Sequence, residues 1–589
     1  MSGMHDMLRS LYQRAKASPW VRSILRNPTV ARWKAAVACR WMARDAEYER
    51  WLTARRTERS NRGYGPAEPG LVSFLTTVWN TPPAFLNAMA TSLFAQSPHT
   101  EFEWVLLDNG TSRTETRAAM ARIARDRRVR FHRVEENLGI VGGMRFCLER
   151  ATGRYVLPID SDDLLEPDTV AVVTAAVREA GFPAIAYTDE DHLLGNKRVF
   201  PYFKPDWDPV LFFNSAYIAH LGVIDRQEAL RLGVYSDSAA NGCHDWDTFE
   251  RFLAAGHTPV HIPEIVYSWR MHAQSTAANV SSKSYIHSSH RKVLERARER
   301  LPHPDHFSVE LSPLFNGTPD WWFRRLPVDP PRVLLVTLGE QEPAREASSA
   351  APVDGLGGEW GDAVVHRRLP LLSGRSLAAA IDEQPDVRFV AIADAAVRPV
   401  RNDWLWEAVG LFERFPQTDL VGGRLVDASG RVLAASYQAF GDESSPGRWQ
   451  SLDAGRLATD SGYFAQMWKQ RTVSGVPLSL SVMSVGLARE LAERLDTGPS
   501  AVHAACAAAA VASQRGKTVL YSPFLTATAP AALARPLDAV SSERLAKPLA
   551  RLAQDRRWYP ASLSESKPYR PAPLTDAAAN SRSSQERAA

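Results

Sequence analysis

The sequence has few cysteines and little net charge, and each shortage excludes a class of protein. Its 589 residues include four cysteines, and these are Cys39, Cys147, Cys243 and Cys506. They lie too far apart for the CxxC spacing of a zinc site or for a disulfide framework. A net charge of +4 on so long a chain does not indicate nucleic acid as the main partner. We therefore expect a reducing, cytoplasmic location and no nucleic-acid partner.

Long apolar segments are also missing. No stretch approaches the roughly 20 apolar residues that a membrane-spanning helix needs, and the N-terminus lacks the apolar core of a signal peptide. Basic residues outnumber acids between Arg9 and Arg62. Such an excess is consistent with a solvated surface or with attraction to anionic headgroups. Peripheral contact with the inner membrane face therefore stays open.

The length predicts at least two domains, because single hydrophobic cores stop growing at roughly 250 to 300 residues. Residues 1–62 have apolar side chains at helical spacing and predict a helical N-terminal extension. The stretch from Ser60 to Gly70 is dense in glycine and proline, which is typical of a linker. Residues 561–589 are rich in serine, proline, alanine and charge, so we expect a disordered tail there.

Between Leu71 and Ile159, short runs of β-forming residues alternate with helical patterns. This alternation predicts βαβ units and a largely parallel sheet. A second, weaker round of the same alternation begins at Arg332, after the proline-rich stretch Leu326 to Pro331. We therefore expect an α/β domain over residues 70–310 and a second one over residues 330–560.

Polar and acidic residues close four consecutive predicted strands of the first domain. The four groups are Asn80, Asp108-Asn-Gly-Thr, Glu136-Asn-Leu-Gly139 and Asp160-Ser-Asp-Asp163. One such group alone is consistent with a helix cap or a turn. Four together predict a ligand site, because ligands bind beyond the carboxyl ends of parallel strands. The three carboxylates after the fourth strand have no basic neighbour in sequence and imply a divalent cation that also binds substrate phosphates.

From about Leu71 to about Leu301 the chain resembles the inverting family 2 glycosyltransferases. Several motifs occur in the order that this family has. They are Val78-Trp-Asn80, Asp108-Asn-Gly-Thr, Glu136-Asn-Leu-Gly139, Asp160-Ser-Asp-Asp163, Tyr187-Thr-Asp-Glu-Asp191, Pro201-Tyr-Phe-Lys-Pro-Asp-Trp207, His244-Asp-Trp-Asp247 and Tyr267-Ser-Trp-Arg-Met-His272. The resemblance implies an α/β GT-A nucleotide-diphospho-sugar transferase fold for residues 70–310.

The resemblance also implies a function. We expect an inverting, metal-dependent hexosyl- or related glycosyltransferase that uses Mn²⁺ or Mg²⁺. The donor would be a nucleotide-diphosphate sugar. The acceptor would be a lipid-linked or polysaccharide glycan of the bacterial surface, such as O-antigen or capsule. Two alternatives remain open, a bifunctional enzyme with two sites and a non-catalytic glycan-binding scaffold.

Family motifs assign roles to particular residues. The expected metal ligands are Asp160, Asp162 and His272. The donor side is expected to comprise Thr77, Trp79, Asn80, Asp108, Asn137, Gly139, Arg145, Asp160, Ser161 and Arg270, with Asp108 on the nucleotide base. The acceptor side is expected to comprise Asp191, Trp207, His244, Trp246, Asp247 and Trp269.

Asp245 is the predicted general base. Inversion requires one carboxylate to accept the proton of the acceptor hydroxyl while the metal stabilises the leaving diphosphate. Acids at the start of a helix are also favoured by the helix dipole, so a purely structural role stays open, above all for Asp247. The chain departs from the family at Asn109, at Met144-Arg145 and at His244, which leaves the donor identity open.

The second domain resembles a GT-A domain that has lost its chemistry. Asp394-Ala-Ala396 stands where a metal motif would close a strand, and Val502-His-Ala-Ala-Cys506 stands where a base motif would begin a helix. We therefore expect a degenerate GT-A-like domain that contributes binding or stability rather than turnover.

Overall fold

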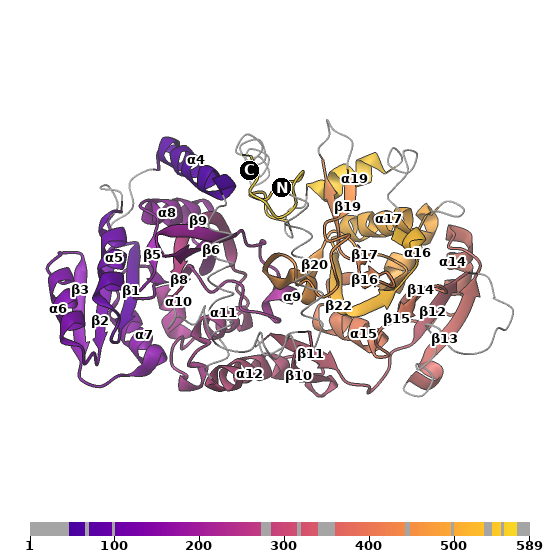
Figure 1. Cartoon of the computed structure of the whole chain (residues 1–589). Helices are drawn as coiled ribbons and strands as arrows, with labels where there is room; N and C mark the ends of the chain where they lie inside the picture. The colour runs from indigo at the N-terminus through magenta and orange to yellow at the C-terminus, as the bar shows by residue number, and fades with distance from the viewer. Residues whose placement is uncertain are drawn as a thin grey trace.

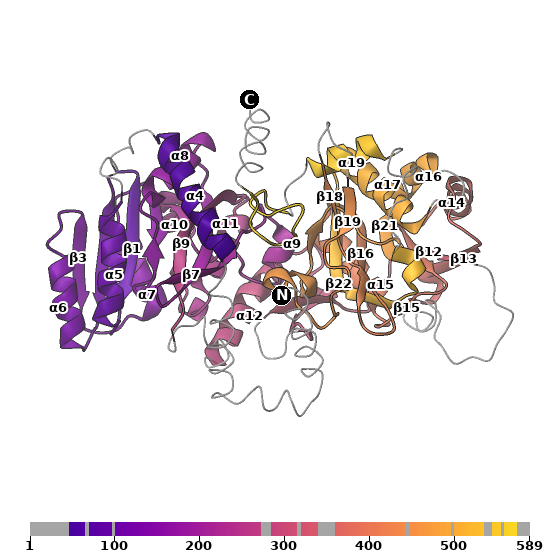
Figure 2. The same cartoon turned by 45° about the horizontal axis from the view of Figure 1, so that its top comes forward.

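A computed structural model of the chain shows two α/β halves side by side, joined by a helix and a β-hairpin (Figure 1). It describes residues 46–64, 70–96, 101–272, 284–314, 320–339, 360–441, 448–495, 500–534, 545–554 and 559–573. The expected helical extension therefore falls partly outside the described residues. Its described part is one helix, α4 (Ala46–Arg62), which lies across the first half (Figures 1 and 2).

The first half is built on a mixed sheet with the strand order β3-β2-β1-β4-β8-β6-β9-β5, and β7 pairs with β6. Its strands are β1 (Val72–Val78), β2 (Glu103–Asn109), β3 (Val129–Val134), β4 (Tyr155–Pro158), β5 (Leu164–Leu165), β6 (Ile185–Leu194), β7 (Lys197–Tyr202), β8 (Gly222–Asp225) and β9 (Val260–Arg270). Its helices are α5 (Pro83–Phe94), α6 (Thr114–Ile123), α7 (Gly139–Arg150), α8 (Thr169–Glu179), α9 (Pro209–Phe212), α10 (Arg226–Arg231), α11 (His244–Ala254) and α12 (Ser284–Glu299).

Both faces of this sheet are covered by helices, and the central strands β1, β2 and β4 are accordingly buried along most of their length. Successive residues of β1 point to opposite faces, so that Phe74 joins the core formed with α5, α6 and α8. Its neighbour Leu75 joins the core formed with α7, α11 and α12. The strands and helices predicted between Leu71 and Ile159 are present, and the predicted fold class is confirmed.

The second half has a sheet with the order β13-β12-β14-β21-β16-β22-β15. Its strands are β12 (Val333–Leu338), β13 (Val364–Leu369), β14 (Phe389–Asp394), β15 (Arg398–Pro399), β16 (Thr418–Val426), β17 (Val432–Ala434), β18 (Tyr437–Phe440), β19 (Arg448–Ser451), β20 (Arg471–Val473), β21 (Leu480–Ser484) and β22 (Thr518–Thr528). Its helices are α14 (Gly374–Asp382), α15 (Trp404–Arg414), α16 (Val485–Arg494), α17 (Ala501–Gln514) and α19 (Ala546–Ala553).

The main order of the second sheet repeats that of the first without β3, and β17 pairs with β16 as β7 pairs with β6. β20, which pairs with β22, has no counterpart in the first sheet, and β18 and β19 form a separate two-stranded sheet. β13, β12, β14, β21, β16, β22 and β15 take the places of β2, β1, β4, β8, β6, β9 and β5. Each neighbouring pair keeps its direction; for example, β6 runs parallel to β9 and β16 runs parallel to β22. The short strands β5 and β15 both pair antiparallel with the long last strand. The predicted second GT-A-like domain is therefore present.

The halves are connected by α12 and by the hairpin of β10 (Phe307–Leu311) and β11 (Trp321–Arg325), and the proline-rich stretch at 326–331 follows β11. They also share a buried contact. The Asp208 side chain caps α9 by accepting hydrogen bonds from the backbone N–H groups of Val210 and Leu211. It also accepts hydrogen bonds from Thr472, through the backbone N–H at 2.8 Å and the hydroxyl at 3.0 Å.

Residues 559–573 pack between the halves, which differs from the disorder expected from residue 561 onward. Tyr569 stacks on Tyr463 with ring centroids 5.2 Å apart, and Tyr559 contacts Phe440 edge-on. Aromatic side chains therefore hold a segment whose overall composition is polar. Among the described residues, no helix is long and apolar enough to cross a membrane.

Asp208→Ala should lower the free energy of unfolding by about 1–3 kcal/mol, because it leaves buried donors of both halves without an acceptor. The matched control is Asp225→Ala, which removes the N-cap of α10 within the first half alone. That change should cost about 1 kcal/mol. Urea unfolding of both variants measures the difference. Equal losses would mean that the Asp208–Thr472 contact adds nothing to stability.

Candidate active site

The carboxyl ends of β1, β2 and β4 meet at one edge of the first sheet, because these three strands are parallel neighbours. Asn80 follows β1, Asp108 lies near the end of β2, and Asp160 follows β4. This is the arrangement in which open α/β sheets bind ligands. The sequence-predicted residues of these three strand ends are thus brought to one edge.

Polar side chains shape the β1 and β2 ends. Asn80 has φ of +55°, and its Oδ1 accepts hydrogen bonds from the backbone N–H groups of Ser112 and Arg113, each at 3.0 Å. Asp108 is buried, and its Oδ1 accepts a hydrogen bond from the Thr111 N–H at 2.9 Å. Trp79 is 59% exposed beside them. Asn80 and Asp108 thus hold the loop after β2, while the exposed Trp79 follows β1. Contact of Asp108 with a base stays a prediction.

The α7 N-terminus packs closely on the same edge. Asn109 donates through Nδ2 to the Gly139 carbonyl at 3.0 Å and accepts from the Leu138 N–H at 2.9 Å. A Cβ on Gly143 would lie 2.8 Å from Thr77 Cγ2, so no larger residue fits there. Asn137 accepts a hydrogen bond from the Gly139 N–H at 2.8 Å. Asn109, which departs from the family pattern, thus holds the predicted donor residues Asn137 and Gly139 against β1 and β2.

Arg145 lies elsewhere. Its Nε is 2.7 Å from Glu149 Oε1, and its Nη1 donates to the Val234 carbonyl at 3.2 Å. Both partners lie on or beside the helices that cover the sheet. A donor contact by Arg145 therefore stays a prediction that its present side-chain position does not support.

The three carboxylates after β4 have different surroundings. Asp160 has a half-exposed side chain. Asp162 accepts a hydrogen bond from His272 Nε2, with 2.7 Å between Nε2 and Oδ2. Asp163 is fully buried and accepts from the Tyr267 hydroxyl and from the Arg270 N–H. Ser161 contacts the Thr81 hydroxyl at 2.6 Å. Asp163 thus anchors the loop that carries Asp160 and Asp162.

His220, which sequence reasoning missed, completes this cluster. Its ring stacks on Tyr267 with centroids 4.9 Å apart, and its Nε2 lies 3.9 Å from Asp160 Oδ2. One ligand atom each from Asp160, Asp163 and His220 lies within 4.8 Å of the others, the only such group among the described residues. His220 stands just before β8 in a stretch with no local motif. Only the folded sheet reveals it.

Electrostatics at this cluster favour a cation. Partial burial raises the pKa of Asp160, whose side chain is half-exposed, and the charges of Asp162 and Asp245 raise it further. Burial raises the pKa of Asp163 well above its ordinary value, and Asp160 and Asp162 add to the shift. The carboxylate oxygens of Asp160 and Asp163 are ligands that suit Mg²⁺ or Mn²⁺, and the half-exposed Asp160 leaves one side of the loop open. The residues present therefore fit a divalent cation.

Asp245 lies in the first turn of α11, and its charge contributes to the raised pKa of both Asp160 and His220. His244 Nε2 is 3.3 Å from Asp245 Oδ1. Asp247 is buried instead, and it accepts a hydrogen bond from Arg251 Nε at 2.8 Å and pairs with Arg296. The two acids thus differ: the Asp245 side chain is 28% exposed, whereas the buried Asp247 joins α11 to α12.

Three consecutive acids of β6 each contact a different basic side chain. Asp189 contacts His261, Glu190 contacts Lys204 and His220, and Asp191 contacts Arg198. Burial opposes ionisation of Glu190, but Lys204 and His220 lower its pKa to about 2. Asp191 is fully buried in its ion pair. Contact of Asp191 with an acceptor stays a prediction.

The predicted acceptor tryptophans are spread out. Trp269 contacts the rings of His192 and His220 and lies beside the carboxylate cluster. Trp207 packs on Phe212 and Tyr217. Trp246 is buried against His290. Of these three, only Trp269 contacts a member of the carboxylate cluster. Their acceptor roles remain predictions.

Comparison with known proteins agrees with this geometry. Residues 73–198 match the model of glycosyl transferase family 2. This segment carries the β1, β2 and β4 ends and all three carboxylates, and it forms a family 2 glycosyl transferase domain.

Two curated relatives extend the comparison. The uncharacterized protein y4gI of Sinorhizobium fredii is 28% identical over 445 residues, which cover 70% of this chain and 48% of that protein. The O-antigen biosynthesis protein RfbC of Myxococcus xanthus is 26% identical over 281 residues, which cover 46% of this chain and 21% of that protein. The chain thus spans about half or less of the length of these relatives.

A chondroitin synthase of Escherichia coli is 25% identical over 208 residues, which cover 34% of this chain and 29% of that protein. Among solved structures, the crystal structure of S. aureus TarS 1-349 in complex with UDP is similar at 18% identity and a TM-score of 0.32. The match covers 40% of this chain and 69% of that one.

His261 provides a test of the charge pattern on β6. Its ring nitrogens lie 2.8 Å from Asp189 Oδ1 and 2.8 Å from Asp206 Oδ1. Burial would lower its pKa, but the two carboxylates raise it from 6.5 to about 9. The contribution of this group to stability is therefore full below about pH 6.5 and is lost as pH rises through about 9.

We expect the imidazole NMR signal that disappears in His261→Gln to titrate with a midpoint near pH 9. A midpoint for His261 at or below the ordinary value of about 6.5 would contradict the assigned ion pairs.

Proposed function

We propose that the chain is an inverting, metal-dependent glycosyltransferase that transfers a hexose or related sugar from a nucleotide-diphosphate donor. The proposed acceptor is a lipid-linked or polysaccharide glycan of the bacterial surface. The observation that supports the proposal is the group of Asp160, Asp163 and His220 after β4, beside a segment that matches family 2, with the charge of Asp245 from α11 acting on Asp160. A base and a cation-binding group at one place are the two requirements of inversion.

In this reaction Asp160 and Asp162 would hold Mn²⁺ or Mg²⁺, which supplies positive charge for the departing diphosphate. Asp163 keeps their loop in place through Tyr267 and Arg270. Asp245 accepts the proton of the acceptor hydroxyl through its carboxylate as that oxygen attacks the anomeric carbon. Direct attack needs no covalent intermediate on the protein.

Arg270 and His272 support the donor side. The Arg270 Nε donates to the Asp162 carbonyl at 2.5 Å, and its guanidinium lies 4.7 Å from the centre of the Phe85 ring. Burial lowers its pKa, although Asp163 and Asp162 counteract this effect. The planar guanidinium is suited to a diphosphate. His272 bonds to Asp162, so its proposed role is to orient a metal ligand or to join the ligands itself.

The relatives support the acceptor class. RfbC is named for O-antigen biosynthesis and another relative is a chondroitin synthase, and both names concern polysaccharides. The three described cysteines are free and buried, which supports a cytoplasmic location. Membrane attraction through α4 has less support, because its Arg55, Arg56 and Arg59 are paired with acids of the protein. The basic residues before position 46 lie outside the described residues.

For the second half we propose a supporting, non-catalytic role. Asp394, at the end of β14, uses its Oδ1 to accept a hydrogen bond from the Ala396 N–H at 2.8 Å. No second acid follows it in Asp394-Ala-Ala396. The bifunctional alternative would need a metal-independent site there. The scaffold alternative would leave Asp160, Asp162 and Asp245 without a use.

Asp162→Ala should abolish Mn²⁺-dependent binding of a nucleotide sugar, because it removes a charged metal ligand. Calorimetry with a panel of nucleotide sugars measures this, and it also identifies the donor. Asp382→Asn, which changes a 66% exposed acid in the second half, is the control. Unchanged Mn²⁺-dependent affinity in Asp162→Ala would remove Asp162 from the metal site.

Asp245→Asn should leave nucleotide binding nearly intact and slow transfer by roughly 10² to 10⁴. Turnover at saturating donor and acceptor measures this in the full-length protein. Substantial transfer remaining in the variant would indicate a different base or a second active site, and would favour the bifunctional alternative.

A further inference from the structure

Helix α4 packs on the first half (Figure 1), and its sequence mixes apolar and charged residues. Tyr48, Trp51 and Leu52 are buried, and the Trp51 ring lies edge-on to Phe203 at 4.9 Å. About two turns further on, Arg59 has a side chain with no exposed surface. A buried arginine is costly unless acids surround it, so its partners define what the helix does.

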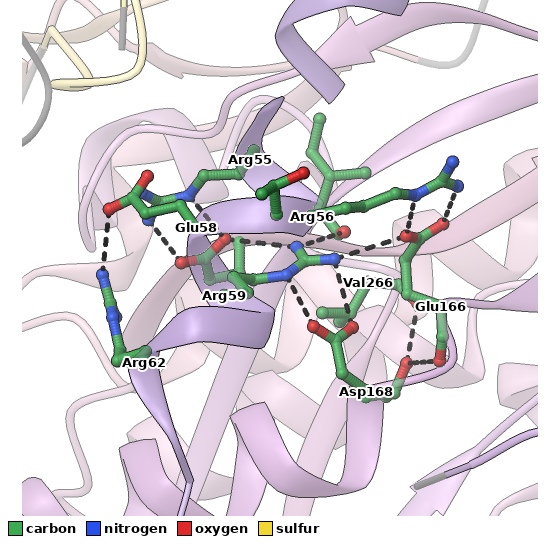
Figure 3. A network of polar contacts seen from close by, with 12 residues as sticks. Arg55, Arg56, Glu58, Arg59, Arg62, Glu166, Asp168 and Val266 are labelled. Atoms are coloured by element: carbon green, nitrogen blue, oxygen red, sulfur yellow. Dashed lines mark hydrogen bonds and ion pairs between the residues drawn. The ribbon is translucent and has the colours of Figure 1, made fainter. Parts of the chain in front are cut away.

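Arg59 joins three acids and a backbone carbonyl (Figure 3). Its Nε and Nη2 donate to the two carboxylate oxygens of Asp168 at 2.8 and 3.1 Å. Its Nη1 contacts Glu264 at 3.3 Å and the Ile265 carbonyl at 3.2 Å, and its Nη2 contacts Glu166 at 3.3 Å. The guanidinium therefore bridges the segment after β5 and the middle of β9.

Neighbouring arginines extend the same bridge. Arg56 forms a two-bond fork on Glu166 at 2.6 and 2.7 Å, and Arg55 pairs with Glu264. Arg198, from β7, pairs with the other side of Glu166 and with Asp191, which also accepts from the Tyr48 hydroxyl. Burial opposes ionisation of Glu166, yet these arginines lower its pKa to about 2.

The acids held by α4 lie just after β5, at Glu166 and Asp168, and on β9, at Glu264. β5 pairs antiparallel with β9, with Leu165 opposite Tyr267, and the Glu166 N–H donates to the Val266 carbonyl at 2.9 Å. Glu166 is three residues beyond Asp163. On β9, Tyr267 and Arg270 bind Asp163, and Arg270 binds the Asp162 carbonyl. The β5–β9 ladder therefore has the carboxylate loop at one end and the α4 contacts at the other.

The second half offers an internal comparison. Its strand β22 takes the place of β9, and Thr518–Thr528 contains no acid. The segment that follows β15 reads Val400-Arg-Asn-Asp403, so that a valine stands where Glu166 follows β5. Asp403 precedes α15 as Asp168 precedes α8, but it pairs with Arg401 of its own segment. This half also lacks the carboxylate trio after β14. Within the described residues of β22 and of the segment after β15, counterparts of Glu166 and Glu264 are therefore absent.

We propose that α4 is a clamp on the active site and that Arg59 is a positioning residue. Arg59 holds the β5–β9 ladder in the register that places Asp162, Asp163 and Arg270 for the metal and the donor diphosphate. This inference rests on the proposed function. It assigns a role to a helix that precedes the family 2 domain in the chain.

Arg59→Lys tests the clamp, because lysine keeps the charge but cannot bridge Asp168, Glu264 and Glu166 at once. The matched control is Arg325→Lys in the hairpin between the halves. Arg325 also has a fully buried side chain, forks onto Glu413 at 2.8 and 3.1 Å and bonds to two carbonyls. Both variants should lose thermal stability, so stability alone does not decide the question.

The deciding readout is the affinity for Mn²⁺ alone, measured on folded protein by the paramagnetic resonance of free Mn²⁺. Arg59→Lys should weaken it by about 10- to 100-fold, as expected when a group that orients metal ligands is lost. Arg325→Lys should leave it unchanged. Unchanged affinity in Arg59→Lys, or an equal loss in the control, would overturn the clamp.

Should Arg59→Lys not fold, Arg56→Gln is the second variant. It removes the two hydrogen bonds from the half-exposed Arg56 to Glu166 and should give a smaller loss of Mn²⁺ affinity.

Hydrogen exchange separates failure of the clamp from failure of the proposed function. In Arg59→Lys the amides of residues 160–166 and 264–270 should exchange faster than in the wild type, and in Arg325→Lys they should not. If the wild type binds no Mn²⁺, the metal-dependent function is wrong, and the exchange pattern still decides whether α4 holds this ladder. Unchanged exchange in both segments would overturn the clamp on its own.

Discussion

Burial of negative charge at the carboxyl edge of the first sheet is the constraint on which the rest of this structure depends. Asp163 has no exposed surface, and β6 places three more acids side by side. A buried carboxylate is stable only when a cation or several donors compensate it. The chain supplies Lys204, His220, His261 and Arg198 for the β6 acids. It leaves the Asp160 side open, and that is where a divalent cation fits.

The same constraint explains the contrast between the halves. The second sheet keeps the strand order and the strand directions of the first, because its apolar strands and covering helices satisfy the same packing rules. Its strand β14 ends in Asp394-Ala-Ala396, with one acid where the first half has Asp160, Asp162 and Asp163. This half contributes a buried surface to the first one, through Thr472 and Tyr463. The two halves thus share a framework and differ in the charge at this strand end.

Much of the site could be predicted because parallel strands bring their ends together. Asn80, Asp108 and Asp160 are far apart in sequence, yet the βαβ pattern alone predicts their common edge. His220 could not be predicted, since it follows no strand-end pattern and reaches Asp160 through the pairing of β8 with β4. Arg145 was assigned from its place after a glycine motif, but its helical position turns it toward Glu149. The direction of a side chain on a helix depends on how the helix is rotated about its axis, and the spacing of a motif does not specify that rotation.

By itself, the sequence determined the α/β class, the strand ends that carry acids and the loss of those acids in the second half. These features follow from apolar periodicity and residue type, which are local properties. Only the tertiary structure decided which acids stay partly exposed and which are buried in ion pairs. Asp245 and Asp247 lie two residues apart on one helix, and Arg296 from α12 pairs with the second. Likewise, the basic helix α4 contacts Glu166 and Asp168, after β5, and Glu264, on β9, because folding brings them within hydrogen-bond distance. This is a relation between distant segments that no local pattern encodes.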